Sequence, residues 1–472
     1  MMNIVIAPEN IVNFDMNEMQ EFQDLIDIYN VHSMKNVQKQ KYYDGKISVN
    51  DVNLGLALPQ NLGGLDIGCA WGAKTVDVLA ARSIFDGFVG LNGSNVEILD
   101  EIVLNNNMMT EYSKACRDEL KLGCVFATLS KDPAKGVQIR FHSEMSAAAK
   151  WDGAKDQIKN GFVIVDTQQD DITKLWTPSI INYHTDKAVW VLTRKDSTWY
   201  ANRIPHKMGR PMMEALIWNA TSDKPFGRSR IKKPIRDLID SYIRTMADAT
   251  IGLEFATSPQ KYLLGVTDDQ YDAIINDKFK QYVGSIIAST TNPETGEKPS
   301  FGQLQQGTIQ PHVDMLRMLS TQYSAATGLT VTDTGVVNEA NPTSSDAIEA
   351  QTKTLVGMAE ELNKGNGAAL RNIALMALAI HENKSLSELT PEQKAIEAHF
   401  KNPAMPSIAS TTDAAIKIAQ TREGFAQTDT FLEMIGFDKA DIRRIKNQEA
   451  QARGLDILGE LGINANQEEP ME

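Results

Sequence analysis

Apolar residues recur at every third or fourth position in several long segments, which is the spacing of helices with one buried face. The most regular segments are 232–256 and 309–326, and the second is followed by Gly328 at a C-cap position. At about 1.5 Å per residue, the first forms a rod roughly 40 Å long. The chain is therefore expected to be largely helical. Other segments with this spacing are 14–45, 74–90 and 110–122.

A different pattern fills the chain between 124 and 203, where short runs of β-branched and aromatic residues alternate with Gly, Asp and Asn turns. Such runs predict strands. Their connections are too short for crossover helices, so the predicted sheet is antiparallel. The fold class is therefore α+β, mainly helical. The predicted strands are 124–130, 137–143, 162–168, 180–184, 188–193 and 199–203.

A small mixed module separates the two long helices. Its pattern predicts a strand, an N-capped helix, a second strand and a charged hairpin tip. Two rods therefore bracket a compact α/β module. These predicted elements are 262–266, 267–281, 283–289 and 292–299.

A loop over 329–344, rich in Gly, Asn and Pro, follows the second long helix. Ser345 can cap a further helix that runs to about 383. Gly365 and Gly367 lie inside this helix and cost about 1 kcal/mol each relative to alanine. They predict that the helix is broken and kinked in its middle.

Composition and charge narrow the class of protein. The 472 residues, 42% hydrophobic and 23% charged, are typical of a soluble globular chain. No window has the roughly 18 apolar residues of a membrane span, and the N-terminus lacks a secretion signal, so we expect a protein that neither spans a membrane nor is secreted. The net charge of −14 argues against a broad basic face that grips nucleic acid. It leaves open a protein past which nucleic acid slides.

Residues with the pattern of a metal or catalytic site are scarce. The cysteines occur without CxxC spacing or a nearby histidine pair, which is typical of reduced thiols rather than metal ligands. The histidines are scattered singly, and no serine elbow is present. We therefore expect no metal, no cofactor and no catalytic residue. The cysteines are Cys69, Cys116 and Cys124.

One segment allows an enzymatic alternative. Asp66 and Gly68 belong to an acidic, glycine-rich turn of the kind with which S-adenosylmethionine-dependent methyltransferases hold their cofactor. Such a turn follows a buried parallel strand, whereas a Pro- and Gly-rich loop precedes this one, and Trp71 stands where a small residue would let the cofactor approach. Because Ala73 separates Lys74 from the preceding glycine, a phosphate loop is also disfavoured, and Lys74 is expected to be a solvated lysine at a helix start. A structural turn is the preferred interpretation, and the methyltransferase stays the alternative.

Several short elements, taken in their order along the chain, resemble one known family. They are Tyr42-Tyr43-Asp44-Gly45-Lys46, Trp71 with Val76-Asp77, Phe85-Asp86-Gly87-Phe88, Pro225-Phe226-Gly227-Arg228-Ser229, Gly328-Leu329 and Asn341-Pro342-Thr343-Ser344-Ser345-Asp346-Ala347-Ile348. Their order is similar to that of the portal, or head-to-tail connector, proteins of tailed double-stranded-DNA bacteriophages of the siphophage type. The resemblance covers about 15–455, and its last element is the most specific.

The resemblance implies the portal fold, with a wing, a two-helix stem, a mixed α/β clip and a helical C-terminal crown. The implied boundaries are 1–225 for the wing, 226–259 for the first stem helix, 260–307 for the clip, 308–329 for the second stem helix, 330–345 for the tunnel loop, 346–384 for the kinked wing helix, and 385–472 for the C-terminal wing or crown and tail.

The resemblance also implies a function. Portal proteins form a dodecameric ring at one capsid vertex, through which double-stranded DNA is packaged and later ejected. An acidic channel wall repels the phosphates, so DNA can move without tight, counterion-releasing contacts. The candidate DNA-facing residues in the tunnel loop and the following helix are Asn338, Asn341, Lys353 and Lys364. The candidate docking residues of the clip are Lys278, Lys280, Glu294, Glu297 and Lys298.

The implied partners are further copies of the chain, the DNA, the terminase large subunit, the major capsid or scaffolding protein, and a head-completion or adaptor protein. No membrane and no cofactor are implied. The implied location is the portal vertex of the virion, and the host cytoplasm during assembly.

Overall fold

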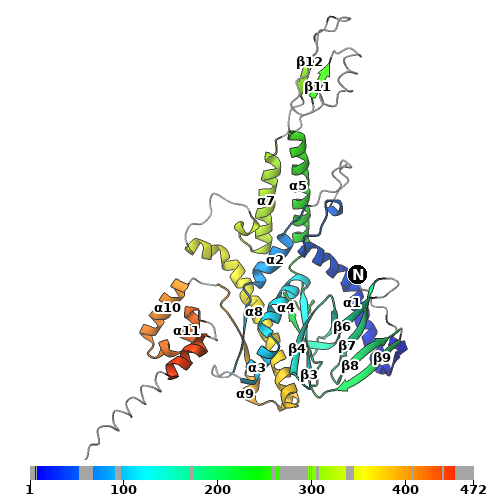
Figure 1. Ribbon diagram of the computed structural model, residues 1–472, viewed down its shortest axis with the longest axis vertical. Coiled ribbons are helices and arrows are strands. Elements are labelled where there is room, and N and C mark those ends of the chain that lie inside the picture. The colour runs from blue at the N-terminus through cyan, green and yellow to red at the C-terminus, as the bar shows by residue number, and fades with distance from the viewer. Residues whose placement is uncertain are drawn as a thin grey trace, which may run out of the picture. The chain divides into compact units, whose positions relative to one another are not determined.

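The computed structural model (Figure 1) divides into two compact units, Met1–Pro403 and Ala404–Glu472, which are described separately. Among the described residues, no helix combines the length and the apolar character that crossing a bilayer requires. The structure describes residues 6, 8–52, 67–90, 97–169, 174–196, 198–257, 261–264, 296, 298, 300–303, 308–335, 345–404, 408–437 and 441–451.

Two sheets form the β-rich part of the first unit. Their strand orders are β1-β9-β8-β7-β6-β5 and β10-β3-β4. The strands pair antiparallel, as predicted, except that β1 runs parallel to β9. The prediction missed β10 and also β5, which begins with a run of alanines, a residue that is depleted in strands. The bounds are β1 (Ile11–Val12), β3 (Cys124–Asp132), β4 (Gly136–Ser143), β5 (Ala147–Asp152), β6 (Gln157–Gln169), β7 (Trp176–His184), β8 (Ala188–Lys195), β9 (Thr198–Pro205) and β10 (Met213–Ile217).

Helix α1 (Met16–Tyr43) covers one face of the six-stranded sheet, and aromatic rings fill the space between them. The Asp15 side chain caps the helix by accepting a 2.9 Å hydrogen bond from the Asn17 backbone N–H. The Phe22 ring centroid lies 5.2 Å from that of Tyr183 and 5.9 Å from that of Phe162. Such pairs add to the stabilisation that burial alone supplies.

The second face of that sheet packs against the three-stranded sheet over part of its area. Apolar side chains of β3, β5, β6 and β10 form this small core. A Cβ at Gly161 would lie only 2.6 Å from the sulfur of Met213, so the glycine lets the sheets approach closely. The core residues are Cys124, Phe126, Ala147, Ala149, Ile158, Val163, Met213 and Ala215.

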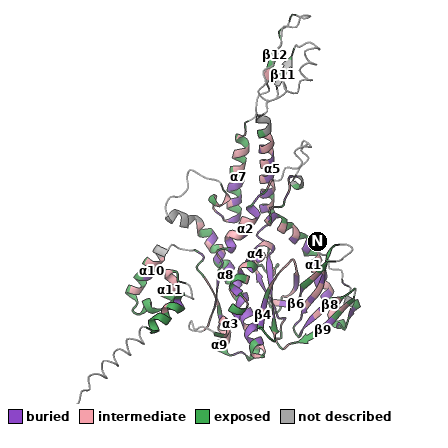
Figure 2. Cartoon of the chain, viewed as in Figure 1, coloured by how far each residue is buried: buried purple, intermediate pink, exposed green. Residues whose placement is uncertain are grey.

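A layer of helices contains the largest core of the first unit. Figure 2 shows α8 mostly buried in its C-terminal half, where it packs against β10, β3 and β13. The helices of this layer are α2 (Trp71–Ala80), α3 (Glu97–Asn105), α4 (Met108–Leu122) and α8 (Ser345–Glu382).

The predicted helix over 74–90 is wrong in its second half. Helix α2 ends at Ala80, and the following segment is the strand β2 (Phe85–Val89). This strand pairs antiparallel with β13 (Glu397–Phe400), a segment far along the chain. Local periodicity carries no signal for such a distant pairing. The predicted helix therefore extended too far, through the residues that form β2.

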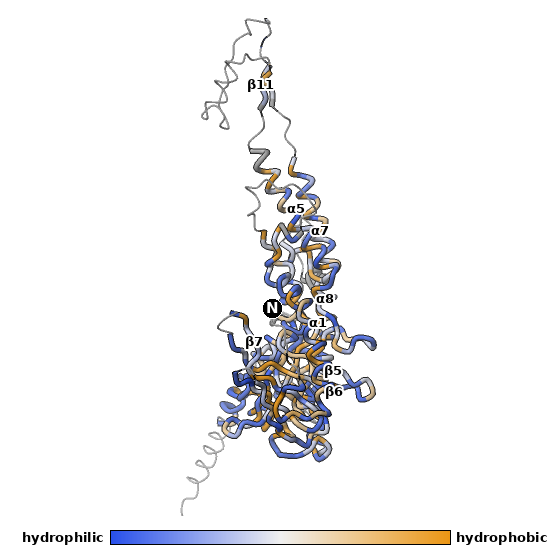
Figure 3. The backbone as a smooth tube through the Cα atoms, turned by 90° about the vertical axis from the view of Figure 1, so that its right-hand side faces the viewer, coloured by the Kyte–Doolittle hydropathy of each residue, from blue (hydrophilic) through white to orange (hydrophobic). Residues whose placement is uncertain are grey.

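The two predicted long helices are present. Helices α5 (Lys233–Thr257) and α7 (Gln310–Thr327) pack side by side as a helical hairpin (Figures 1 and 3). Between them in sequence, β11 (Lys261–Leu264) pairs antiparallel with β12 (Ser300–Gln303). The predicted helix at 267–281 and strand at 283–289 lie outside the described residues.

Helix α8 continues through Gly365 and Gly367, so the predicted break in the helix is wrong. A Cβ at either glycine would make only ordinary contacts, 3.9 Å from the Ile217 carbonyl oxygen and 3.5 Å from the Phe400 ring. The two glycines lower the helix propensity of this segment. Packing against neighbouring elements on both sides nevertheless keeps it helical.

The remaining elements are short. In the second unit, α10 (Ile408–Thr421) and α11 (Asp429–Ile435) pack together, and 441–451 is helical. The other described elements are η1 (Pro8–Asn10), η2 (Val49–Val52), η5 (Thr332–Thr334), η6 (Leu386–Glu388), α9 (Pro391–Lys394) and η7 (Phe425–Gln427).

Candidate functional site at the base of the helical hairpin

Three aromatic rings join α2 to both helices of the hairpin. The ring centroids of Trp71 and Tyr323 are 4.5 Å apart with an interplanar angle of 20°, and Tyr242 of α5 lies 4.7 Å from Trp71. The Tyr323 hydroxyl donates a 2.6 Å hydrogen bond to the Trp71 carbonyl oxygen. Burial raises the pKa of Tyr323, so the phenol stays protonated and can donate.

A buried arginine ties the same elements together. The Arg230 guanidinium donates to the carbonyl oxygens of Thr75 at 2.7 Å and of Thr327 at 2.9 Å. Thr327 ends α7, where the helix dipole favours a cation. Burial lowers the pKa of Arg230 to about 10, which keeps the group charged at neutral pH. Carbonyl dipoles, rather than a carboxylate of the described part of the chain, thus balance this charge.

Two motif glycines allow backbones to meet at this junction. A Cβ at Gly72 would lie 2.0 Å from the Tyr42 carbonyl oxygen. Gly227 has a φ of +67°, and its Cβ would lie 2.1 Å from the Trp218 carbonyl oxygen. Only glycine fits at such distances.

The C-terminal end of α1 completes the junction. The Tyr42 hydroxyl donates to both carboxylate oxygens of Asp240 on α5, at 2.9 and 3.0 Å. The Tyr43 hydroxyl donates to Asp77 on α2 at 2.9 Å. Burial raises the pKa of Asp240, while the hydrogen bond from Tyr42 opposes that shift. Segments that looked like separate sequence motifs therefore meet in one place.

Lys74 does not have the free, solvated position that its sequence predicted. Its amine donates to the carbonyl oxygen of Asp333 in η5. The Asp333 carboxylate in turn accepts hydrogen bonds from the backbone N–H and the hydroxyl of Thr330, at 2.9 and 2.8 Å. The first residues of the predicted tunnel loop are thereby fastened to α2.

The methyltransferase alternative is not supported. Gly68 is exposed and borders open space, and Trp71 next to it is buried against the hairpin instead of leaving room for a cofactor. Asp66 lies outside the described residues. The glycine-rich turn serves the packing of α2.

The predicted DNA-facing residues are described only in part. Lys353 and Lys364 are exposed on α8. They are about three turns apart, which places them on one face and about 16 Å apart along the axis. Neither forms an ion pair with a residue that the structure describes. Asn338 and Asn341 lie outside the described residues.

The structure describes only one of the five predicted docking residues of the module between the helices. Lys298 is exposed. The others, Lys278, Lys280, Glu294 and Glu297, lie outside the described residues.

Sequence reasoning missed a buried polar network between α4 and α8. The Asn366 side-chain amide, between Gly365 and Gly367 of α8, donates to Glu119 at 2.8 Å and to the Tyr112 hydroxyl at 3.0 Å. Ser83 links Tyr112 to Asn363 through bonds of 2.6 Å. Burial raises the pKa of Glu119 to about 8. The only local signal was an asparagine where an apolar residue was expected.

The sequence of this chain is similar to those of known phage portal proteins. The family model described as "Phage portal protein, SPP1 Gp6-like" matches residues 24–454. The portal protein of Mycobacterium phage L5 is 23% identical over 461 residues, covering 93% of this chain and 90% of that protein. The portal protein of Mycobacterium phage D29 is 22% identical over 272 residues, covering 56% of this chain and 53% of that protein.

Two solved structures are also similar. The neck of a native GTA particle, computed with C12 symmetry, matches with a TM-score of 0.44 and 11% identity, over 78% of this chain and 89% of that one. The neck of an empty GTA particle, computed with C6 symmetry, matches with a TM-score of 0.47 and 10% identity, over 78% and 90%. Both TM-scores lie below 0.5, and neither match bears on the conclusion.

The match to the family model extends over most of the chain and agrees with the resemblance that the sequence motifs indicated. Both named relatives are portal proteins of phages. The chain therefore belongs to the SPP1 Gp6-like family of phage portal proteins.

Proposed function

We propose that twelve copies of the chain form a ring at one vertex of the capsid, with a central channel through which double-stranded DNA is packaged and ejected. Membership of the portal family supports this proposal. The observation that carries it is the unpaired apolar surface of the hairpin, where Leu253, Met315 and Met318 are 47%, 37% and 47% exposed. A neighbouring hairpin would cover these side chains, since burial of apolar surface favours association.

The proposed parts follow the order of the elements along the chain. The stem consists of 226–259 and 308–329, which contain α5 and α7, and the clip is 260–307. The tunnel loop is 330–345, and its first residues are held by Lys74. The wing consists of 1–225 and of 346–384, which contains most of α8. The segment 385–472 supplies the C-terminal wing or crown and the tail.

We propose that Lys353 and Lys364, with Asn338 and Asn341 of the tunnel loop, face the DNA. Two observations on the lysines support this proposal. Lys353 and Lys364 share one exposed face of α8, and neither forms an ion pair with a described residue. A few cations on an acidic ring allow weak, salt-sensitive contacts, which suit a channel that must let DNA move.

The proposed partners at the clip are the terminase large subunit during packaging and a head-completion protein afterwards. Their proposed docking residues are Lys278, Lys280, Glu294, Glu297 and the exposed Lys298. The wing would meet the major capsid or scaffolding protein. Assembly would take place in the host cytoplasm, and the finished ring would belong to the virion.

The test is the mass of the purified protein by multi-angle light scattering, together with negative-stain images. We expect a particle with a mass about twelve times that of the chain and a central channel. Added scaffolding protein is the second condition, because it supplies a template for assembly. A protein that stays monomeric in both conditions would contradict the proposed ring.

A further inference from the structure

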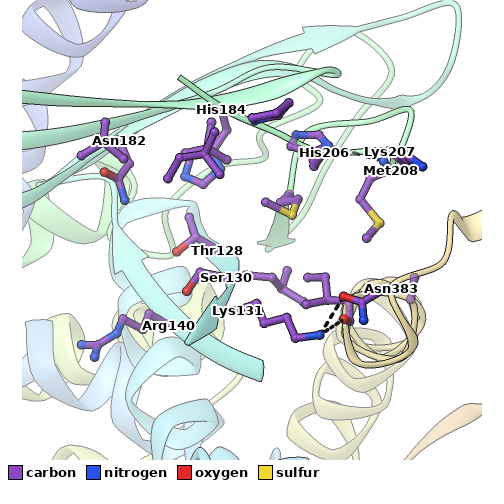
Figure 4. A pocket seen from close by; sticks show the side chains of 18 of the residues that line it. Thr128, Ser130, Lys131, Arg140, Asn182, His184, His206, Lys207, Met208 and Asn383 are labelled. Carbon is purple, nitrogen blue, oxygen red and sulfur yellow. Dashed lines mark hydrogen bonds between the residues drawn. The ribbon is translucent and has the colours of Figure 1, made fainter. Parts of the chain in front are cut away.

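A cavity of about 620 Å³, partly open to solvent, lies between the two sheets where their facing surfaces are not filled by the small core described above (Figure 4). Its walls are formed by β6, β7, β8 and β9 of the larger sheet, by β3 and β4 of the smaller sheet, by the segment 206–212 that follows β9, and by the C-terminal end of α8. A volume of this size lies in the range of about 300–1,000 Å³ that small-molecule sites occupy. Protein interiors are otherwise close-packed, so a gap of this size between two sheets leaves room for a ligand.

The alternation of side chains along β7 shows why the gap is not filled. Ile181 and Tyr183 point to the aromatic core under α1, so Asn182 and His184 point to the other face. Figure 4 shows these two side chains on one side of the cavity, with Thr128 and Ser130 on the other. Polar residues thus occupy positions where two packed sheets ordinarily place apolar ones.

His184 is the most informative of these residues. Its side chain is only 2% exposed, and neither ring nitrogen has a hydrogen-bond partner in the part of the chain that the structure describes. Burial, with the nearby His142 and His206, lowers the pKa of His184 to about 3, so the ring is neutral and has one N–H donor and one acceptor. Buried polar groups are nearly always satisfied, which indicates that a group inside the cavity pairs with this ring.

The described side chains with a full charge that line the cavity are all cationic. Four exposed cations, Lys131, Arg140, Lys207 and Lys384, line the cavity, and among the described residues its lining contains no aspartate or glutamate. Lys384 pairs with Glu382 at 2.6 Å. Arg140 forms no ion pair with an acidic residue of the described segments, whereas Lys207, after the hydrogen bonds from Ser385, helps to lower the pKa of Glu388. In a chain with a net charge of −14, such a cationic cavity selects for an anion.

Other parts of the wall are apolar and would bury a hydrocarbon body. These apolar residues include Leu129, Val189, Val191, Ile204, Met208 and Met212.

We propose that this inter-sheet cavity binds a small organic anion with an apolar body, such as a medium-chain carboxylate. Val189, Val191 and Met212 contact the apolar body. Arg140 and Lys207 attract the anionic group, and the His184 N–H is available to donate to it. All residues of this site belong to one chain, so its test does not depend on the proposed assembly.

The experiment measures displacement of the fluorescent probe 8-anilinonaphthalene-1-sulfonate from the full-length protein. Three competitors separate the contributions: octanoate has the apolar body and the charge, octanol the body alone, and acetate the charge alone. We expect octanoate to displace the probe at a concentration at least tenfold lower than either of the others. Equal potency of octanoate and octanol would overturn the proposal, since it would indicate a merely apolar surface.

Matched variants locate the binding. Val191→Trp, which fills the cavity, should abolish displacement by octanoate, and the double variant Arg140→Gln/Lys207→Gln should weaken it at least fivefold. Lys155→Gln, on the exposed turn between β5 and β6, is the control and should change nothing. Circular dichroism and the mass of the particle confirm that each variant folds. Folded cavity variants that bind octanoate as the wild type does would place the ligand elsewhere and overturn the assignment.

Discussion

The indole of Trp71 stacks on the ring of Tyr323, 252 positions away in the sequence, and the tyrosine hydroxyl donates to the tryptophan carbonyl oxygen. This one pair joins α2 to α7. The pair thus attaches the base of the hairpin to the helical layer.

The stack and the hydrogen bond can be measured separately. Tyr323→Phe keeps the stacked ring and removes the hydroxyl, and it should lower the free energy of unfolding by about 1–2 kcal/mol. Trp71→Ala removes the ring and should cost about 3–5 kcal/mol. Denaturant unfolding measures both. Tyr200→Phe is the control, because that side chain is 41% exposed. If all three variants unfolded alike, the junction would have no special role in stability.

Alanine substitutions at Gly136 and Gly227 distinguish the cost of backbone strain alone from the cost of strain combined with a steric clash. Both have positive φ, +67° and +73°, but a Cβ at Gly136 meets only open space, whereas one at Gly227 lies 2.1 Å from the Trp218 carbonyl oxygen. Gly136→Ala should cost about 1–2 kcal/mol from strain alone. Gly227→Ala should cost about 3–5 kcal/mol, because the backbone must also move. Thermal unfolding of the two variants tests this, and equal losses would contradict the close approach.

Glu119 should make stability depend on pH. Burial raises its pKa from 4.5 in the unfolded chain to about 8 in the folded one. Between these values the folded state binds the proton and the unfolded state does not, so the free energy of unfolding falls as pH rises, by up to about 1.4 kcal/mol per pH unit.

The variant Glu119→Gln cannot ionise and still accepts the hydrogen bond from Asn366. Its free energy of unfolding should therefore lack the Glu119 contribution to the fall between pH 5 and pH 8, and it should exceed that of the wild type at pH 8. The control is Glu111→Gln, which changes a partly exposed glutamate of the same helix that pairs with Lys114. Parallel pH profiles for wild type and Glu119→Gln would show that Glu119 ionises normally.

The exposed methionines of α7 test the proposed contact between hairpins. Met315 and Met318 are three positions apart and share one face of the helix. Changing both to glutamate should prevent ring assembly, because like charges would then meet where an apolar contact forms. Light scattering gives the mass. Met16→Glu, at an 81% exposed position of α1, should leave assembly unchanged. A normal ring from the double variant would place the subunit contact elsewhere.

The lysines of α8 test the proposed channel face. Lys353→Gln/Lys364→Gln should weaken binding of a short DNA duplex to the assembled ring. It should also make the dependence of log K on log salt shallower, because fewer counterions are released. Lys417→Gln, an exposed lysine of α10 in the second unit, is the control. Fluorescence anisotropy at several salt concentrations gives both quantities, and an unchanged salt dependence would remove these lysines from the channel.

The sequence by itself determined the elements whose signal is local. The long helices α5 and α7 and the strands β3, β4, β8 and β9 follow from periodicity, since one buried face imposes its spacing on nearby residues. The motif order also led to the portal family, which the comparisons confirmed.

Only the tertiary structure decided the features that depend on residues far apart in the chain. Strand β2 forms because β13 pairs with it. Helix α8 stays continuous through Gly365 and Gly367 because neighbouring elements pack on both sides of this segment. Lys74 is held by a carbonyl on a loop that no local pattern connects to it. The cavity beside His184 arises where two sheets diverge. The physical reason is the same each time: long-range contacts supply the free energy that overrides local propensity, and no local window of sequence contains both partners.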